Sequence, residues 1–527
     1  MTRKTPQLSR RGLLAAAAVG TLSACSGDDS GTSSGPSSGP PTGSASTGSG
    51  ATSSAAPSGS PTNADWAQLG RSVEGSLVLP SDPTYNQVRL LENPRYDDER
   101  PLAVLQVSSA QDVASGLAFA QQHAVPVALR SGGHSYPGWS GGGSPKALVI
   151  DCRPLNQVTL DGTTATVGSG AALADVYDAI GGQGRAIAAG SCATVGVAGL
   201  TLGGGVGVLT RAMGLTCDAV NSMQVVTADG TVRTASAQEE PDLFWALRGG
   251  GGGHLGVVTS FEFETSAAPT LQTVYLQWPI SAAAQVIEAW QQWAPSADPG
   301  LWSTLKALGG QKHTGGPILL LSGTWSGSPG ALDGQLAGLL NHVPKPSTDS
   351  RKSQSYRDAM LSFAGCSSIP IAQCNTGPGG SLTRESFGAT SHVAYDPLTS
   401  AGIDDLLGQV QAAQSSGLLE AGISIDALGG RVQDVAPDAT AFPHRAALAT
   451  VQYTATYASG SPQAADDYVR GFRAAMVPYW GAHAYVNYSD ARLSDYLSAY
   501  FGDNAARLAE ARSTYDPNGF FTQPQDF

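Results

Sequence analysis

The stretch Arg130–Ser140, RSGGHSYPGWS, places a histidine directly behind two glycines and ahead of a serine and a tyrosine. Glycine lets the backbone adopt positive φ and come close to another molecule. A loop of this composition is typical of a site that wraps a ligand. His134 would be held in it where it can touch that ligand.

Strands and helices alternate around this loop. Apolar runs predict strands, and apolar residues at helical spacing predict helices. Asp229-Gly230 joins two of the runs with the pattern of a β-hairpin turn. We therefore predict an α+β domain whose strands lead into glycine-rich loops. The strands are expected at 102–107, 125–129, 147–151, 164–168, 220–228, 231–235 and 256–264, and the helices at 110–123, 171–180 and 241–247.

The region 270–479 has longer strands that are followed by helices, which predicts an antiparallel sheet with helices on one face. Four aromatic residues of these strands are candidates to face a sugar, although aromatic residues in strands more often belong to a core. The expected strands include 274–278, 318–325 and 447–457, and the helices lie near 281–293, 331–342, 403–415 and 463–476. The aromatic candidates are Trp278, Trp325, Tyr453 and Tyr457.

The chain has 527 residues, of which 13% are charged, and a formal net charge of −13. Its length is enough for two or three domains with a large core. The acidic balance argues against nucleic acid or an anionic membrane as a partner, because both attract basic patches.

The N-terminus carries targeting patterns. Ser9–Leu14, SRRGLL, resembles a twin-arginine export signal, and the apolar run that follows is too short to span a bilayer. Leu22–Cys25, LSAC, resembles a lipoprotein cleavage box that would leave a lipid on Cys25; ordinary cleavage near Ala24 is the alternative. We predict a signal at 1–25 and a disordered Ser/Gly/Pro tether at 26–63. Because the twin-arginine route carries folded proteins, it hints at a cofactor loaded before export.

Three glycine-rich segments stand out, at 130–135, 190–207 and 249–258. Backbone N–H groups in such loops form concave anion sites that suit a diphosphate. The dinucleotide fingerprint GxGxxG is missing after the first predicted strand, and no GxxxxGK[ST] loop is present. These absences exclude a P-loop nucleotidase but leave open another diphosphate-containing cofactor.

The second glycine segment contains Cys192, as the first contains His134. If Cys25 is lipidated, five cysteines remain, so at least one is unpaired. Cys366 and Cys374 are close enough in sequence to close a loop, although the sequence leaves the pairing open. Taken singly, the histidine and the cysteine each have an ordinary structural interpretation. Together, on two loops that approach a ligand, they indicate covalent capture of one cofactor.

The chain resembles the berberine bridge enzyme-like flavin oxidases, whose FAD-binding fold is that of vanillyl-alcohol oxidase and p-cresol methylhydroxylase (PCMH type). The resemblance covers residues 66–527 and implies an FAD-binding domain at 66–268, a substrate-binding domain at 269–479 and a C-terminal segment at 480–527 that completes the FAD domain. The matching stretches are RSGGHSYPG at 130–138, GSCATVG at 190–196, LGGGVGVLTRAMGLTCDAV at 202–220, DLFWALRGGGGGHLGVVT at 242–259, FPHR at 442–445, YVNYSD at 485–490 and FGDNAARLAEARSTYDPNGFFTQPQ at 501–525.

The resemblance implies an FAD bound twice, through its 8α-methyl to His134 and through C6 to Cys192. Both bonds lie on the benzenoid rim and leave N5 open to substrate. Other cofactor contacts are carried over from the family, with the first five expected to line the pyrophosphate. They are Arg130, Ser131, Gly132, Gly133, Ser135, Val195, Gly196, Gly199, Val258 and Asn487.

The same resemblance makes Tyr488 the catalytic base. Alternation in Tyr485–Tyr488 predicts a strand with Val486 and Tyr488 on one face and Asn487 on the other. A free phenol has a pKa near ~10, so the base needs a neighbour that stabilises its phenolate. Tyr136 is the expected second aromatic of the pocket. Gln452 should point into the site, in a strand where some relatives place a glutamate base.

His254 stands where relatives commonly carry asparagine, and it would either hydrogen-bond the flavin or face solvent. The histidines are dispersed without metal-ligand spacing, so no metal site is predicted. Val195 is a small residue at a position that the family associates with oxygen access.

These observations predict an FAD-dependent oxidase that oxidises an alcohol or hemiacetal of a carbohydrate or secondary metabolite and reduces dioxygen to hydrogen peroxide. The expected partners are a small-molecule substrate and dioxygen, with no nucleic acid. The protein would be a monomer that meets a membrane only through a lipid on Cys25. One alternative is a flavin dehydrogenase with another electron acceptor. The other is a surface lipoprotein that binds a ligand without catalysis.

Overall fold

A computed structural model describes residues 59–458, 460 and 462–527. The predicted signal and residues 26–58 of the predicted tether lie outside this range. The described chain enters its first helix, α1 (Asn63–Ser72), where the side chain of Thr62 accepts a hydrogen bond from the backbone of Asp65. None of the described helices is long and apolar enough to cross a lipid bilayer.

The first sheet has four strands, in the spatial order β1 (Ser76–Val78), β2 (Ala103–Gln106), β4 (Leu148–Asp151) and β3 (Val127–Arg130). The last three run parallel, and parallel strands are covered on both faces, which explains their uninterrupted apolar runs. Helix α3 (Ala110–Gln122) shares an apolar core with them. β3 ends at Arg130, so the first glycine loop starts at the end of a buried strand.

The second sheet has five antiparallel strands, in the order β5 (Val158–Asp161), β6 (Thr164–Gly168), β10 (Val257–Glu264), β8 (Val220–Val226) and β9 (Val232–Ser236). A two-stranded ribbon lies apart from it. Helices between these strands complete the core of the region. The ribbon pairs β7 (Arg185–Ala186) with β11 (Ser266–Ala267), and the helices are α4 (Leu173–Gly181), α5 (Val197–Leu202), α6 (Thr210–Met213) and α7 (Pro241–Ala246). Helix α2 (Tyr85–Val88) instead lies between β1 and β2 and packs on the first sheet.

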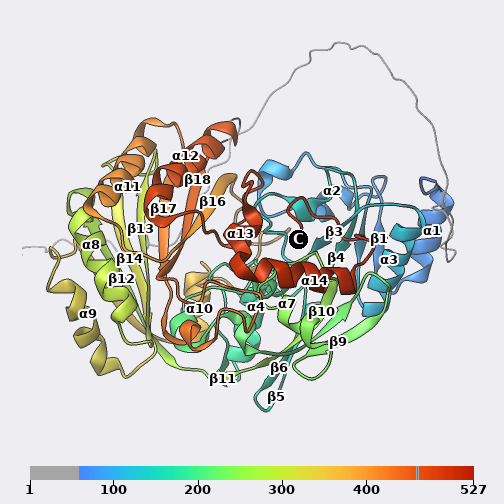
Figure 1. The fold of residues 1–527 in the computed structure, drawn as a ribbon, viewed down its shortest axis with the longest axis horizontal. Coiled ribbons are helices and arrows are strands. Elements are labelled where there is room, and N and C mark those ends of the chain that lie inside the picture. Colours follow the sequence, from blue (N-terminus) through green and yellow to red (C-terminus); the bar gives the residue numbers. More distant parts are fainter. Residues whose placement is uncertain (1–58, 459, 461) are drawn as a thin grey trace, which may run out of the picture.

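The third sheet has seven strands, all antiparallel. Four helices lie along its outer face (Figure 1). This arrangement confirms the predicted α+β class with a helix-flanked antiparallel sheet. The strand order is β15 (Thr348–Ser355), β12 (Thr270–Pro279), β14 (Ile318–Trp325), β13 (Leu301–Gly309), β17 (Glu420–Ala427), β18 (Ala449–Thr456) and β16 (Phe387–Ala394), and the helices are α8 (Ala283–Trp293), α9 (Leu332–Leu340), α11 (Ser400–Ala412) and α12 (Pro462–Trp480).

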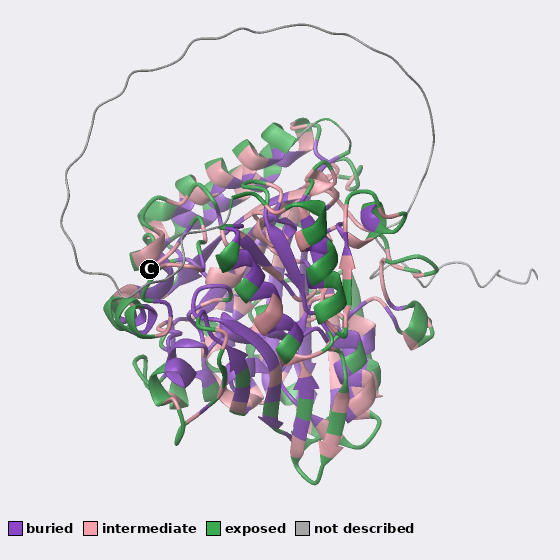
Figure 2. Cartoon of the chain, turned by 90° about the vertical axis from the view of Figure 1, so that its right-hand side faces the viewer, coloured by how far each residue is buried: buried purple, intermediate pink, exposed green. Residues whose placement is uncertain are grey.

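Alternation along these strands separates an apolar face from a polar one. Leu305, Ile423 and Val451 point to the helices and form one core with them. Figure 2 shows the opposite side of the molecule, where exposed residues likewise gather on the outer turns of the helices and buried ones lie inside. The inner face carries the intervening polar side chains, because successive residues of a strand point to opposite faces.

The four aromatic residues proposed to face a sugar belong to the helix-covered face. All four are buried in the core between the seven-stranded sheet and its helices, so that prediction is wrong. Trp278, Trp325 and Tyr453 are in register with apolar residues of neighbouring strands, and Tyr457 follows the end of β18.

The C-terminal helices return to the first part of the chain. Residues of α13 (Tyr496–Phe501) and α14 (Ala505–Tyr515) share a core with the five-stranded sheet. Figure 1 shows these red helices beside α7 and β10. Helix α10 (Tyr356–Phe363), which follows β15 of the seven-stranded sheet, joins the same core through Tyr356, whose hydroxyl donates to the carbonyl of Ile187.

Candidate active site

The first two glycine loops touch each other through their backbones. A Cβ atom on Gly132 would collide with the amide nitrogen of Gly196, and one on Gly196 would collide with the side chain of Ser131. The hydroxyl of Ser131 donates to the carbonyl of Ser169 at 2.6 Å. Only glycine permits this approach, which brings 130–135 and 190–199 into one structure.

An open space lies beside the contact between the two loops. No atom lies within 4 Å of the position that a Cβ would take on Gly199, in helix α5. Gly133 has a φ of 77°, a left-handed conformation that favours glycine. The two loops therefore form a cradle with an unfilled side.

His134 borders this cradle. Its Nε2 lies 2.8 Å from Oγ1 of Thr194, two residues beyond Cys192, and 3.9 Å from Oε2 of Glu92. Burial lowers the pKa of His134, and the charge of Glu92 acts in the opposite direction. The ring is therefore predominantly neutral at neutral pH, the state in which an imidazole nitrogen can form a new bond.

Among the free cysteines of the described residues, Cys192 is exposed, whereas Cys152 and Cys217 are buried. The protein around it raises the pKa of the Cys192 thiol by desolvation, while the charge of Lys306 lowers it. The structure thus brings His134 and Cys192 to adjacent loops at one cradle.

Three predicted catalytic side chains lie together. The rings of Tyr136 and Tyr488 are stacked, with 5.6 Å between centroids and an interplanar angle of 5°. The side-chain amide of Gln452, from β18, donates to the hydroxyl of Tyr136. Burial is the largest cause that raises the pKa of each tyrosine well above its ordinary value.

The predicted strand at 485–488 is wrong. Val486–Tyr488 forms a 3-10 helix, η10, and the amide of Tyr488 donates to the carbonyl of Tyr485. Residues i and i+3 eclipse in such a turn, so the rings of Tyr485 and Tyr488 touch, with centroids 5.0 Å apart. Ser391 in β16 accepts the amide of Tyr485 and so holds the turn against the sheet.

Asn487 and Tyr485 connect the C-terminal segment to the second glycine loop. The amide of Asn487 donates to the carbonyl of Leu200 and to the hydroxyl of Tyr485, each at 2.9 Å. That hydroxyl also accepts the backbone N–H of Gly205. These bonds tie the end of α5 to the turn that carries Tyr488.

Two family models match this chain. One, described as an FAD binding domain, matches residues 101–236, and the other, described as berberine and berberine like, matches residues 484–526. The FAD-linked oxidoreductase YvdP of Bacillus subtilis is 31% identical over 462 residues, which cover 86% of this chain and 97% of that protein. The chain belongs to the berberine bridge enzyme-like family of FAD-linked oxidoreductases.

Other berberine bridge enzyme-like proteins have the same fold. The structure of Physcomitrella patens BBE-like 1 is 28% identical, with a TM-score of 0.80 over 88% of this chain and 98% of that one. Chitooligosaccharide oxidase of Gibberella zeae is 29% identical over 484 residues, covering 87% of this chain and 92% of that protein. A solved chitooligosaccharide oxidase is 25% identical, with a TM-score of 0.78 over 88% and 98% of the two chains.

The cradle of this berberine bridge enzyme-like protein suits FAD. The glycine contacts exclude side chains, as the close approach of a diphosphate to a backbone requires, and Gly199 at the edge of the cradle is exposed. Within the described residues, no cluster of three His, Cys, Asp or Glu side chains could hold a metal ion.

Arg130 does not place its guanidinium in the cradle. The side chain is buried, donates to the carbonyl of Arg89 at 3.0 Å and pairs with Asp151 at 3.3 Å. The guanidinium of Arg130 is therefore not available to the pyrophosphate, and only its backbone could contact it. Arg130 is the last residue of β3 and lies opposite Asp151 of β4, so the two side chains pair within the first sheet.

The remaining predicted residues differ in accessibility. Ser135 is half-buried within the first loop. Val195 is partly buried against the core, and its carbonyl accepts the N–H of Leu173. Val258 is buried in β10. His254 is 7% exposed and its Nδ1 lies 3.0 Å from Oδ1 of Asp526, so it does not face solvent.

The motifs did not predict two charged residues of the inner sheet face. Asp426 in β17 is directly opposite Thr304 of β13, and Lys306 of β13 is opposite Ser424. Burial raises the pKa of Asp426, while Thr304 and Lys306 lower it. The charge of Asp426 in turn raises the pKa of Tyr488. A charged residue inside an otherwise apolar strand is the sequence signal that could have identified both.

Proposed function

We propose that this protein is an oxidase whose FAD is attached covalently to His134 and Cys192 and which oxidises an alcohol or hemiacetal group. One observation carries the proposal: the loops of His134 and Cys192 form a single cradle, and Tyr136, stacked on Tyr488, lies in the same loop as His134. Two attachment residues and a candidate base therefore surround one space.

Bound FAD supplies the hydride acceptor for this reaction. Tyr488 takes the proton of the substrate hydroxyl as the hydride leaves the adjacent carbon. The charge of Asp426 raises the pKa of that phenol and disfavours its phenolate, so Asp426 is not the stabilising neighbour expected of the base. Gln452 holds the hydroxyl of Tyr136 beside the base. Dioxygen reaches the flavin past Val195. It is reduced to hydrogen peroxide.

A carbohydrate is the favoured substrate. The inner sheet face offers hydroxyl, amide and charged side chains in register across three strands, which can hydrogen-bond several sugar hydroxyls. Relatives include proteins named chitooligosaccharide oxidase, and a carbohydrate oxidase structure from Microdochium nivale, 25% identical with a TM-score of 0.77 over 88% of this chain and 99% of that one, shares the fold. The polar side chains are Thr304, Lys306, Ser424, Asp426 and Gln452.

Export by the twin-arginine route and a lipid on Cys25 belong to the same proposal. An enzyme displayed outside the cell would meet oligosaccharides and dioxygen directly. We also propose that the protein acts as a monomer.

Acid precipitation of the full-length protein tests the covalent flavin. The pellet is expected to be yellow, and His134→Ala combined with Cys192→Ala is expected to release the flavin into the supernatant. Cys217→Ala, at a buried thiol, is the matched control and should retain it. A colourless wild-type pellet would contradict the attachment. A panel of oligosaccharides and alcohols assayed for peroxide then tests the oxidase activity.

A further inference from the structure

Two side chains lie at the same nitrogen of His134. Thr194 Oγ1 is 2.8 Å and Glu92 Oε2 is 3.9 Å from Nε2, while none of the described residues forms a hydrogen bond at Nδ1. The side chains of His134 and Glu92 are only 23% and 19% exposed. Water therefore screens their interaction less than it would on an open surface.

Glu92 is itself held in place. Its backbone N–H donates to the carbonyl of Gly133, directly before the histidine. Its carboxylate accepts the hydroxyl of Thr376 at 2.9 Å. The first glycine loop thus holds the backbone of Glu92, and Thr376 holds its carboxylate.

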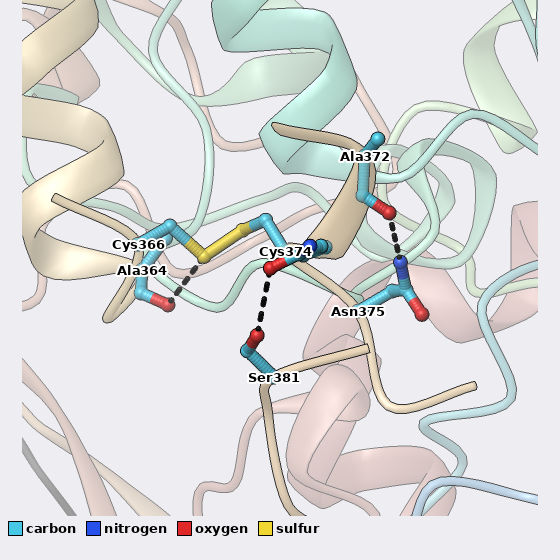
Figure 3. Close-up of a disulfide and its surroundings, with 7 residues drawn as sticks. Ala364, Cys366, Ala372, Cys374, Asn375 and Ser381 are labelled. Carbon is cyan, nitrogen blue, oxygen red and sulfur yellow. Dashed lines mark hydrogen bonds between the residues drawn. A yellow bond between two sulfur atoms is a disulfide. The ribbon is translucent and has the colours of Figure 1, made fainter. Parts of the chain in front are cut away.

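Thr376 follows a loop that is closed by a disulfide. Cys366 and Cys374 are bonded, a pairing that the sequence left open (Figure 3). Both half-cystines are buried in a cluster with Ala193, the residue after Cys192. One short loop therefore packs on the cysteine side of the cradle and, through Thr376, holds the carboxylate on the histidine side.

A carboxylate near Nε2 favours the tautomer that carries its proton on Nε2. Because a neutral imidazole has one N–H and one lone pair, this tautomer leaves the lone pair on Nδ1. Thr194 can accept the Nε2 proton in a hydrogen bond and so fixes the plane of the ring. Both effects prepare Nδ1 for bond formation.

We propose that Glu92 and Thr194 are positioning residues that set the tautomer and orientation of His134 for attachment of FAD, and that the Cys366–Cys374 loop holds Glu92 through Thr376. This inference rests on the proposed covalent attachment. In the net step, a bond forms between Nδ1 and the 8α carbon, and the N–H and C–H bonds break. Two protons and two electrons are released; the electrons pass through the flavin to dioxygen and form hydrogen peroxide. Nε2 then releases its proton to solvent, and the charge of Glu92 stabilises the imidazolium that precedes this release.

The test separates the two flavin bonds. In full-length Cys192→Ala protein, retention of flavin after acid depends on His134 alone. There, Glu92→Gln is expected to slow covalent incorporation about tenfold, because it removes a partly buried negative charge beside the imidazole. In His134→Ala protein, the same substitution should not slow incorporation through Cys192, because the charge of Glu92 raises the pKa of that thiol and its removal favours the reactive thiolate. Equal slowing in both backgrounds would show a general structural effect and overturn the proposal.

The pH dependence of incorporation provides a second readout. Full-length Cys192→Ala protein produced without flavin is incubated with FAD in air across a pH series. Because the charge of Glu92 raises the pKa of His134, Glu92→Gln should move the acidic limb of the rate to lower pH. Glu92→Asp should restore part of the rate. An unshifted limb would overturn the role of Glu92.

The disulfide loop has its own matched pair of variants. Thr376→Val removes the hydroxyl that binds Glu92 and is expected to slow incorporation through His134 in the same direction as Glu92→Gln. Ser381→Ala removes a neighbouring hydroxyl that bonds Gln373 instead, and it should have no effect (Figure 3). Equal effects of the two would overturn the link through Thr376.

Failure of this inference is distinguishable from failure of the proposed function. If the wild-type protein loses all its flavin in acid, both are overturned. If it retains flavin while Glu92→Gln in the Cys192→Ala background incorporates at the unchanged rate, only the inference about Glu92 is overturned.

Discussion

The rings of Tyr136 and Tyr488 lie parallel, 5.6 Å apart, although one residue belongs to the first glycine loop and the other to the C-terminal segment. The stack places Tyr488, the candidate base, against Tyr136, which follows His134 by two residues. Gln452 binds the hydroxyl of Tyr136 rather than that of Tyr488. The two phenols are therefore unequal, and substitutions can tell them apart.

Removing the hydroxyl of Tyr488 should affect proton transfer most. Tyr488→Phe preserves the stacked ring and is expected to slow flavin reduction by substrate about 10²–10⁴-fold, as loss of a general base does. Tyr136→Phe loses the hydrogen bond from Gln452 and should slow it by about tenfold or less. Anaerobic stopped-flow absorbance measures both rates. Equal losses would argue against Tyr488 as the base.

The pH profile of flavin reduction should reflect the raised pKa of Tyr488. Burial, then the charge of Asp426, raises this pKa, so the free enzyme holds the phenol protonated at neutral pH and the rate should rise towards alkaline pH. Asp426→Asn removes the negative charge and should move the midpoint to lower pH. A pH series of kcat/KM checks the direction, and a shift to higher pH would contradict it.

Acid should destabilise the fold through two buried histidines. Burial lowers the pKa of His392 and of His444 to about 3, whereas an unfolded histidine titrates near about 6.5. Between these values the unfolded chain binds more protons, so the free energy of unfolding should fall as pH decreases. His392→Gln should reduce that slope by up to about 1.4 kcal/mol per pH unit. Urea denaturation at several pH values measures it, with exposed His342→Gln as the reference.

Val195 provides a test of the electron acceptor. Val195→Ile adds bulk to a partly buried position beside Gly196, and it should slow reoxidation of the reduced enzyme by dioxygen about tenfold, a barrier of about 1.4 kcal/mol. Flavin reduction by substrate should be unchanged. Stopped-flow mixing with air-saturated buffer measures the step. Slow reoxidation of the wild-type protein itself would favour the dehydrogenase alternative.

The targeting prediction can be checked by fractionation. Replacing Arg10 and Arg11 with lysine should retain the protein inside the cell. Cys25→Ser should release it from the membrane fraction into the medium without loss of flavin. A wild-type protein found free in the medium would contradict the lipid anchor.

The sequence by itself determined the local structure that depends on neighbouring residues. Strand period and turn chemistry located β14 and β6 at their observed bounds, and the glycines of 130–135 and 190–207 marked the cradle. These features are local because a period of two and a positive φ are properties of a few consecutive residues. The family motifs identified the FAD-linked oxidoreductase in the same way.

Only the tertiary structure decided which face of each strand meets the site. Alternation shows that a strand has two faces, but the helices packed on one of them sent Trp278 into the core and left Asp426 on the inner face. Long-range hydrogen bonds folded 485–488 into a turn and brought Glu92 and Thr376 to His134. Such contacts join residues far apart in the chain, and no local pattern records them.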